Sequence, residues 1–207
     1  MIRFFDILFS LFGLIILAPF FIIISLLIIC TSRGNVFYFQ TRVGKQNKDF
    51  TLYKFRTMRT DADKKCLLTV GEKDTRITGI GYLLRKYKID ELPQLWNVLK
   101  GDMSLVGPRP EVRKYVELYN NDQKRVLEVR PGITDYASIE YVNENQLLAQ
   151  SDNPEKQYIE IIMPEKLKIN LRYIENRSLK NYFKILLLTM KRILQTAFAT
   201  PDTKKVL

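Results

Sequence analysis

The chain has 207 residues, and its 33 lysine and arginine residues outnumber its 22 aspartate and glutamate residues, giving a formal net charge of +11. It contains no histidine, which excludes Ser-His-Asp triads, Cys-His pairs and zinc sites with histidine ligands. Its two cysteines, Cys30 and Cys66, are too few for a cysteine-only zinc cluster or a disulfide framework, and they fit a reducing compartment.

The positive charge is concentrated after residue 32. Residues 1–32 contain one cation and one anion, so the whole excess falls on residues 33–207. Such an excess predicts an anionic partner, which could be nucleic acid, a phosphate-bearing substrate or an acidic membrane surface. The length favours one globular domain.

The first predicted element is a membrane-embedded helix over residues 1–32. Residues 7–30 are 24 consecutive residues without a charge. As a straight helix they would measure about 36 Å at about 1.5 Å per residue, against a bilayer core of about 30 Å. A basic segment follows instead of a cleavage site, so we interpret the helix as an anchor. Pro19 cannot donate to the Ile15 carbonyl, which predicts a bend at Ala18-Pro19.

Two topologies fit this helix. A continuous helix would span the bilayer, whereas a helix broken at Pro19 would enter and leave through one leaflet. The positive-inside rule places residue 33 onward in the cytoplasm and says little about the N-terminus. The residues by themselves favour the span.

For residues 33–207 the sequence predicts an α+β, mainly helical domain. Aromatic-rich runs at residues 36–40 and 50–55 flank a polar, glycine-containing stretch, which predicts a small β-hairpin. This hairpin would bring together four basic side chains, those of Arg42, Lys45, Lys54 and Arg56.

Helices are expected from residue 79 onward, separated by loops. The first begins with residues 79–85, and a second covers residues 90–99 and stops at Gly101. Residues 100–111 are expected to form a loop, and residues 154–174 a long helix interrupted near Pro164. The apolar residues of 179–198 are spaced by three and four among lysines, which predicts an amphipathic basic helix. It would either lie on the membrane surface or pack into the core.

Asp90 and Glu91 form a compact acidic pair within this basic chain. The plain interpretation is that Asp90 caps a helix and Glu91 complements the helix dipole. Their surroundings favour another interpretation, because Arg85 and a rigid turn around Arg109 lie within twenty residues. Carboxylates with Mg²⁺ beside fixed arginines are suited to phosphoryl transfer from a nucleotide diphosphate.

Five ordered blocks of the sequence resemble the bacterial sugar transferases, the monotopic phosphoglycosyl transferases. The blocks are QTRVG at 40–44, YKFRTMR at 53–59, DELPQ at 90–94 with Asn97, GDMSLVGPRP at 101–110 and RPGIT at 130–134. With the proline-containing apolar helix, they cover most of residues 1–140. The length matches small members of the family that consist of the catalytic domain only.

The resemblance implies transfer of sugar 1-phosphate from a UDP-sugar to polyprenyl phosphate, with release of UMP. It implies that Asp90 attacks the sugar-linked phosphate to form an acyl-phosphate. Glu91 would assist with Mg²⁺ or proton transfer, so both carboxylates are candidate metal ligands. The implied residues that bind phosphate or nucleotide sugar are Lys54, Arg56, Arg85, Pro108, Arg109, Pro110 and Arg130.

The resemblance also implies that the helix over residues 1–32 is re-entrant, which reverses the preference for a span. It places the catalytic domain on the cytoplasmic face of the bacterial inner membrane, with no nucleic acid as functional partner. Many relatives continue RPGIT with Gly-Trp-Ala-Gln, whereas this chain has Asp135-Tyr136-Ala137-Ser138. The sequence does not identify the sugar.

Two alternatives remain. One is a membrane-anchored binding module whose basic patches grip anionic lipid or nucleic acid without catalysis, although such a module has no need for Asp90 and Glu91 beside Arg85. The other is a span-anchored transferase in which Asp90 serves only as a metal ligand.

Overall fold

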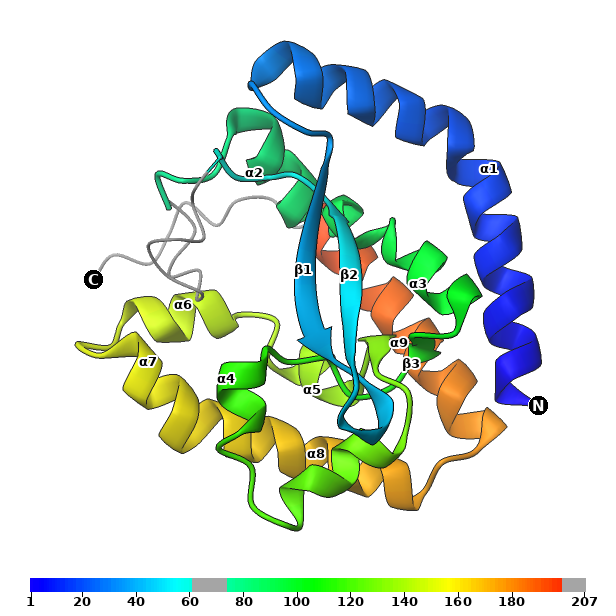
Figure 1. Ribbon diagram of the computed structural model, residues 1–207, viewed down its shortest axis with the longest axis vertical. Coiled ribbons are helices and arrows are strands. Elements are labelled where there is room, and N and C mark those ends of the chain that lie inside the picture. The colour runs from blue at the N-terminus through cyan, green and yellow to red at the C-terminus, as the bar shows by residue number, and fades with distance from the viewer. Residues whose placement is uncertain (61–73, 199–207) are drawn as a thin grey trace.

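The computed structural model describes residues 1–60 and 74–198, and within them the fold is mainly helical (Figure 1). Cys66 and the C-terminal residues 199–207 lie outside the described part. The first elements are α1 (Ile2–Thr31), β1 (Phe37–Val43), η1 (Lys45–Asn47), β2 (Asp49–Phe55), α2 (Gly79–Lys86), η3 (Ile89–Glu91), α3 (Gln94–Lys100) and β3 (Ser104–Val106). They are followed by α4 (Arg113–Val116), η4 (Gln123–Glu128), β4 (Gly132–Thr134), α5 (Tyr136–Glu140), α6 (Glu144–Ala149), α7 (Pro154–Gln157), η5 (Tyr158–Ile162), α8 (Met163–Glu175) and α9 (Leu179–Phe198).

Helix α1 is long and apolar enough to cross a membrane, and most of its surface is exposed. It contains Pro19, and Figure 1 shows it strongly bent along its length while it remains one helix. The predicted bend is therefore confirmed as a change of direction within a continuous helix. The missing proline amide and the ring's clash with the preceding turn account for it.

Both ends of α1 are bonded to the rest of the protein. Near its start, the buried Asp6 carboxylate accepts hydrogen bonds from Ser104 Oγ at 3.0 Å and from the Leu105 amide at 2.9 Å. Just after its end, Arg56 donates to the Ser32 carbonyl at 2.8 Å and to the Arg33 carbonyl at 2.6 Å. The same folded body thus holds the helix at both ends.

The predicted hairpin is confirmed, with longer strands than expected. Strands β1 and β2 pair antiparallel from Val43 opposite Asp49 to Phe37 opposite Phe55. The prediction that Lys45 and Arg56 lie close together is wrong. Lys45 is in the turn η1, whereas Arg56 follows the last residue of β2 at the other end of the hairpin. Strands of seven residues separate them by roughly 20 Å.

The expected helix over residues 90–99 is divided in two. Residues 89–91 form the short 3₁₀ turn η3, and α3 begins only at Gln94 because Pro93 has no amide to continue the hydrogen bonding. Helix α3 ends at Gly101, whose φ of 100° suits glycine, as expected.

The stretch 100–111 contains a short strand that the sequence did not predict. Strand β3 pairs parallel with β4, and glycines allow the chains to approach closely. A Cβ atom added at Gly132 would lie 2.1 Å from the Gly107 amide nitrogen, and one at Gly107 would lie 2.5 Å from the Arg130 carbonyl oxygen. Glycine is therefore required at both positions, and Gly107 directly precedes the turn that carries Arg109.

The long helical run near Pro164 is confirmed as α7, the π-helical segment η5 and α8. The wider π-helical turns directly precede Pro164, which cannot donate a hydrogen bond. One face of helix α9 packs into the core, where Tyr182 and Ile185 are fully buried, while Leu187 and Met190 are exposed.

The buried side chains form three clusters. One lies between the end of β1, α4, η4 and α8, and another lies between α3, β3 and α9. The third joins Ile24 and Ile28 of α1 to Phe55 and Leu84. The hairpin and α3 are held between these clusters, which fixes the position of η3.

Candidate active site

The 3₁₀ turn η3 carries Asp90 and Glu91, and both are buried. It follows α2 through Lys88, whose left-handed φ of 58° turns the chain sharply between the two helices. The plain interpretation that Asp90 caps a helix is wrong, because α3 begins after Pro93 and has no side-chain cap. The carboxylate pair is therefore buried without a capping role at α3.

Glu91 is held between two cations from distant parts of the chain. Lys54 Nζ on β2 lies 2.9 Å from Glu91 Oε1. Arg109 donates from Nη1 to Glu91 Oε2 at 3.1 Å and from Nη2 to Oε1, which makes the pair bidentate. Burial opposes ionisation of Glu91, but the charges of Arg109 and Lys54 outweigh it and hold its pKa well below the usual range. Glu91 is thus a fixed anion.

The pKa of Asp90 is shifted in the opposite direction to that of Glu91. Burial and the neighbouring charge of Glu91 raise the pKa of Asp90, although Lys54 and Arg85 partly oppose the rise. Its Oδ1 atom is sealed from solvent and has no hydrogen-bond partner among the described residues. A buried carboxylate oxygen without a partner is costly for the fold, which marks it as a functional candidate.

Arg85 is oriented by Thr57, because its Nε donates to Thr57 Oγ1 at 2.8 Å. Burial lowers the pKa of Arg85, while the charge of Asp90 opposes that change. The predicted grouping of Arg85, Lys54 and Arg109 around the carboxylate pair is therefore present in the structure.

The turn of Pro108, Arg109 and Pro110 is fixed by its backbone. The Arg109 amide donates to Asp135 Oδ2 at 3.0 Å, and the Pro108 carbonyl accepts from Gly132 at 2.9 Å. The Pro110 carbonyl accepts from Arg42 Nη1 at 3.1 Å. These bonds and the two proline rings aim the Arg109 side chain at Glu91.

Asn97 fixes α3 to the hairpin. Its Oδ1 accepts from the Tyr53 amide at 3.0 Å, and its Nδ2 donates to the Thr51 carbonyl at 2.7 Å. Asn97 is fully buried. Because Lys54 directly follows Tyr53, this link sets the distance between Lys54 and the turn that carries Glu91.

Arg56 and Arg130, predicted to bind phosphate or nucleotide sugar, are engaged elsewhere. Arg56 is bonded to the chain just after α1, as described above. Arg130 Nε donates to the Gly101 carbonyl at 2.8 Å, at the end of α3 opposite to the carboxylate pair. In this structure both arginines tie backbone segments together.

Three residues of the site were not predicted from the sequence. Asp135 appeared only as a departure from the family pattern, yet it is fully buried and also accepts from Asn170 Nδ2 at 2.9 Å. The position of Asp135 before the short helix α5 was a usable signal, but nothing local marked Asn170. Gln94 and Arg42 line a small cavity together with Leu52, Lys54, Arg109 and Pro110. Gln94 lies within a motif quoted above and had no assigned role, whereas Arg42 was predicted only as one of the basic side chains of the hairpin.

The site can therefore bind an anion beside a carboxylate. The cavity has cations from both strands of the hairpin and from the proline-flanked turn. Gln94 Nε2 at its wall is buried and has no partner among the residues that the structure describes. Among the described residues there is no group of three or more acidic or cysteine side chains that could hold a metal ion. A metal ion here would need ligands from a substrate as well.

Comparison with known proteins agrees with this arrangement. The family model described as bacterial sugar transferase matches residues 1–196. The chain belongs to the bacterial sugar transferase family. It is 44% identical to the sugar transferase EpsL of Bacillus subtilis over 159 residues, which are 77% of this chain and 70% of that protein.

Two longer relatives have names that specify a reaction. The chain is 41% identical over 137 residues to a UDP-N-acetylgalactosamine-undecaprenyl-phosphate N-acetylgalactosaminephosphotransferase of Aeromonas hydrophila, covering 65% of this chain and 32% of the relative. It is 34% identical over 180 residues to the UDP-glucose:undecaprenyl-phosphate glucose-1-phosphate transferase of Escherichia coli, covering 86% and 36%. The chain thus spans about a third of these family members, whose sugars differ.

Proposed function

We propose that this chain transfers a sugar 1-phosphate from a UDP-sugar to undecaprenyl phosphate and releases UMP. The observation that carries the proposal is the pairing of a clamped Glu91 with Asp90, whose buried Oδ1 has no partner within residues 1–60 and 74–198. The family relatives named for this reaction support the same donor and acceptor classes.

The chemistry has two displacements at one phosphorus atom. The Asp90 carboxylate attacks the sugar-linked phosphorus, the bond to the bridging oxygen breaks, and UMP leaves with that electron pair. A phosphate oxygen of the lipid then attacks the same phosphorus and displaces the Asp90 carboxylate. Arg109 and Lys54 stabilise the phosphate oxygens, and burial keeps water away from the acyl-phosphate.

We include Mg²⁺ in the proposal as a partner of the donor diphosphate. Mg²⁺ in proteins is commonly held by one or two carboxylates plus substrate phosphates, and it neutralises charge on phosphate oxygens. The unpartnered oxygen of Asp90 fits such a ligand set, with Glu91 beside it. The ligands would come partly from the donor, in keeping with the absence of a three-carboxylate group in the described residues.

The proposed topology is re-entrant, with both ends of α1 on the cytoplasmic face of the inner membrane. A spanning helix would place its ends about 30 Å apart on opposite sides of the bilayer. The contacts at Asp6 and Ser32 instead bind both ends to one folded body. The bend at Pro19 supports the same arrangement (Figure 1).

Helix α9 is proposed to rest on the same membrane surface. Its exposed face carries Leu187, Met190 and Leu194, and exposed lysines flank it. Thr189 anchors the opposite face through a contact of 2.7 Å with the Thr134 hydroxyl. A helix with one face packed in the core and the other face apolar and exposed can lie on the membrane surface. It would then hold the site at the depth of a lipid phosphate.

A noncatalytic binding module is the competing proposal. It accounts for the basic surface and for α1, but it gives no reason to bury Asp90 without a partner. We therefore favour the enzyme.

Intact-mass measurement after incubation with donor alone tests the proposed function. A panel of UDP-sugars is offered to the detergent-solubilised protein, and a sugar phosphate should be added to the wild type and not to Asp90→Asn. Added undecaprenyl phosphate should remove the adduct and yield one UMP per transfer. UMP release that requires both substrates, without any adduct, would contradict the covalent mechanism. No UMP release from any donor would contradict the transferase.

A further inference from the structure

The small cavity beside Lys54 is bounded by hydrogen-bond donors. Its lining residues are Arg42, Leu52, Lys54, Gln94, Arg109 and Pro110. Three of these side chains are cations, one is an amide, and none is acidic. The cavity has room for about one water-sized group. It is therefore too small for a sugar or a base, but it fits a single oxygen atom of an anion.

Gln94 contributes a donor that the fold leaves unused. Its side chain is buried, and its Nε2 is sealed from solvent with no hydrogen-bond partner in residues 1–60 and 74–198. Leaving such a donor unpaired is costly for the fold. The neighbouring cations do not satisfy it, because lysine and arginine side chains have no acceptor atom. An acceptor that enters the cavity would pair with this amide.

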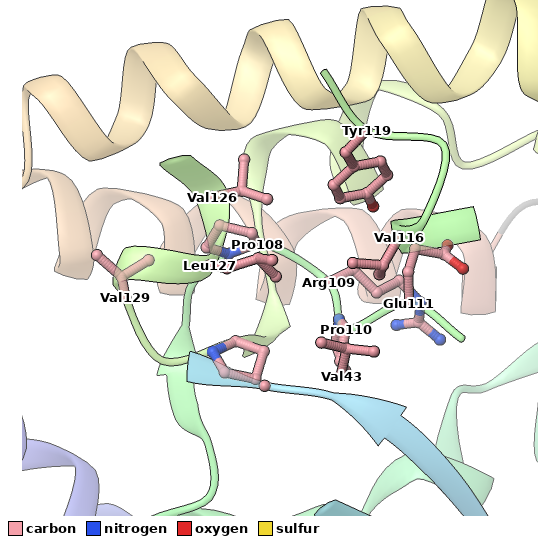
Figure 2. A pocket seen from close by; sticks show the side chains of 12 residues that line it. Val43, Pro108, Arg109, Pro110, Glu111, Val116, Tyr119, Val126, Leu127 and Val129 are labelled. Carbon is pink, nitrogen blue, oxygen red and sulfur yellow. The ribbon is translucent and has the colours of Figure 1, made fainter. Parts of the chain in front are cut away.

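The charges of the cavity favour an anionic oxygen over water. A water molecule would bring two hydrogens into a space whose side chains offer no acidic acceptor, whereas an anionic oxygen accepts from all of its neighbours. The far side of the Arg109 turn is different, because apolar Val116 and Val126 and the Glu111 carboxylate belong to its walls (Figure 2). An anion is therefore expected on the side of Lys54 and Gln94.

The cavity adjoins the carboxylate pair. Lys54 Nζ lies 2.9 Å from Glu91 Oε1, and Arg109 binds the same carboxylate. Burial lowers the pKa of Lys54, and the charges of Glu91 and Asp90 oppose that change, which places both carboxylates near this lysine. The side chains of Lys54 and Arg109 are 17% and 31% exposed, so a ligand can reach them from solvent. A phosphate with one oxygen in the cavity would keep its phosphorus on the side of the carboxylates.

We propose that this cavity is an oxyanion hole for the phosphate that is transferred, and that Gln94 Nε2 donates a hydrogen bond to one of its nonbridging oxygens. The inference rests on the proposed function and adds a catalytic residue to it. The transition state of phosphoryl transfer spreads charge over the equatorial oxygens, and a donor fixed at one of them stabilises that charge. Because the cavity admits one oxygen, the two nonbridging oxygens of the sugar-linked phosphate become inequivalent.

Single-turnover formation of the Asp90 adduct by the full chain in detergent tests this assignment. Gln94→Leu removes the donor and should slow adduct formation about a hundredfold, the effect of losing one oxyanion-hole donor. Its unfolding temperature should not fall, because the amide has no partner to lose. Gln94→Glu places a carboxylate among three cations. It should unfold no lower than the wild type and slow the reaction at least as much, because the carboxylate repels the phosphate.

Donors with sulfur in place of one nonbridging oxygen of the sugar-linked phosphate test which oxygen enters the cavity. The two diastereomers place the sulfur differently. The one that must put sulfur into the cavity should react about tenfold more slowly with the wild type, since sulfur is larger and a weaker acceptor. In Gln94→Leu the difference between the diastereomers should shrink, because the donor that distinguishes them is gone.

The matched control is Gln157→Leu. Gln157 on α7 also has a sealed atom, Oε1, without a partner in the described part of the chain, but it is not in the cavity wall. This variant should keep the wild-type rate and the wild-type preference between diastereomers. Thermal unfolding identifies any variant that fails to fold, and Gln94→Glu decides the question if Gln94→Leu is unfolded.

The outcomes separate the inference from the proposed function. Wild-type rates of adduct formation in the folded Gln94 variants would overturn the oxyanion hole and leave the transferase standing. So would an unchanged preference between diastereomers in Gln94→Leu. If the wild type forms no adduct and releases no UMP from any donor, the proposed function fails, and the oxyanion hole fails with it.

Discussion

The Tyr182 hydroxyl donates a hydrogen bond of 2.9 Å to Asp6 Oδ1, joining the start of α1 to α9 across 176 positions of sequence. Both residues are buried, and the same carboxylate oxygen accepts from Ser104 and Leu105. One aspartate therefore connects α1, β3 and α9. This bond couples the proposed membrane anchor to the proposed membrane-surface helix.

Loss of the Asp6 carboxylate should destabilise the protein more than loss of the Tyr182 hydroxyl. Asp6→Ala leaves three buried donors without an acceptor and should lower the free energy of unfolding by about 2–3 kcal/mol, whereas Tyr182→Phe should lower it by about 1 kcal/mol. Thermal unfolding in detergent measures both. The double variant should be no less stable than Asp6→Ala, because the tyrosine has then already lost its acceptor. Fully additive losses would show that the two residues act independently.

Asp90→Asn should make the protein inactive and more stable. The folded-state pKa of Asp90 is raised, so its ionised form is disfavoured by folding, and the penalty is present above that pKa. Removing the charge should raise the free energy of unfolding by about 1 kcal/mol at neutral pH, which is about 2–4 °C in the unfolding midpoint for a chain of this size. Glu91→Gln, which breaks a clamped ion pair, should instead lower the midpoint. A lower midpoint in Asp90→Asn would contradict the assigned electrostatics.

The rate of adduct formation should fall at low pH, because protonation of Asp90 removes the nucleophile. Since the pKa of this carboxyl is raised above its ordinary 3.8, the nucleophilic form disappears at a higher pH than for an exposed aspartate. Arg85→Gln removes a positive charge that favours the ionised form, so the acid limb should move further up in pH. Lys86→Gln, an exposed charge change on the same helix, should leave the limb where it is. Single-turnover rates against pH measure the three profiles, and coincident profiles would exclude Asp90 as the titrating group.

Charge reversal on α9 should separate the two half-reactions. Lys180→Glu, Lys184→Glu and Lys191→Glu together remove cations that each contribute about 1 kcal/mol of attraction to an anionic membrane. Transfer to vesicle-embedded acceptor should fall at least tenfold, while adduct formation from the soluble donor should change little. Lys124→Glu with Lys156→Glu, two exposed lysines on η4 and α7, is the control and should affect neither step. Equal loss in both steps would assign α9 to the core alone.

Asp135 should act on activity through Arg109. Asp135→Ala removes the acceptor of the Arg109 amide and of Asn170 Nδ2. The rate of adduct formation should fall at least tenfold as the turn that aims Arg109 at Glu91 loosens. Asp135→Asn with Asn170→Asp exchanges the donor and acceptor groups and should recover part of the loss. If Asp135→Ala reduces stability without changing the rate in the remaining folded protein, the residue is only structural.

Elements that depend on local patterns were predictable from the residues alone. The uncharged stretch of residues 7–30 fixed α1, and Pro19 fixed its bend, because both depend on composition and on one missing amide. Aromatic-rich runs on either side of a polar, glycine-containing stretch predicted the hairpin, and Gly101 marked the end of α3. The motifs around Asp90 and Arg109 identified the family and the main site residues, because their order along the chain is a sequence property.

Long-range packing sets which charged side chains form ion pairs. Lys54 and Arg109 reach Glu91 across 37 and 18 positions, and no local pattern specifies such ion pairs. The same long-range packing occupies Arg56 with the chain after α1, although it stands two residues from Lys54. The short strands β3 and β4 form only because Gly107 and Gly132 approach each other in the folded protein. Burial, which only the fold creates, leaves Asp90 Oδ1 without a partner in the described part of the chain and thereby makes an ordinary aspartate a candidate nucleophile.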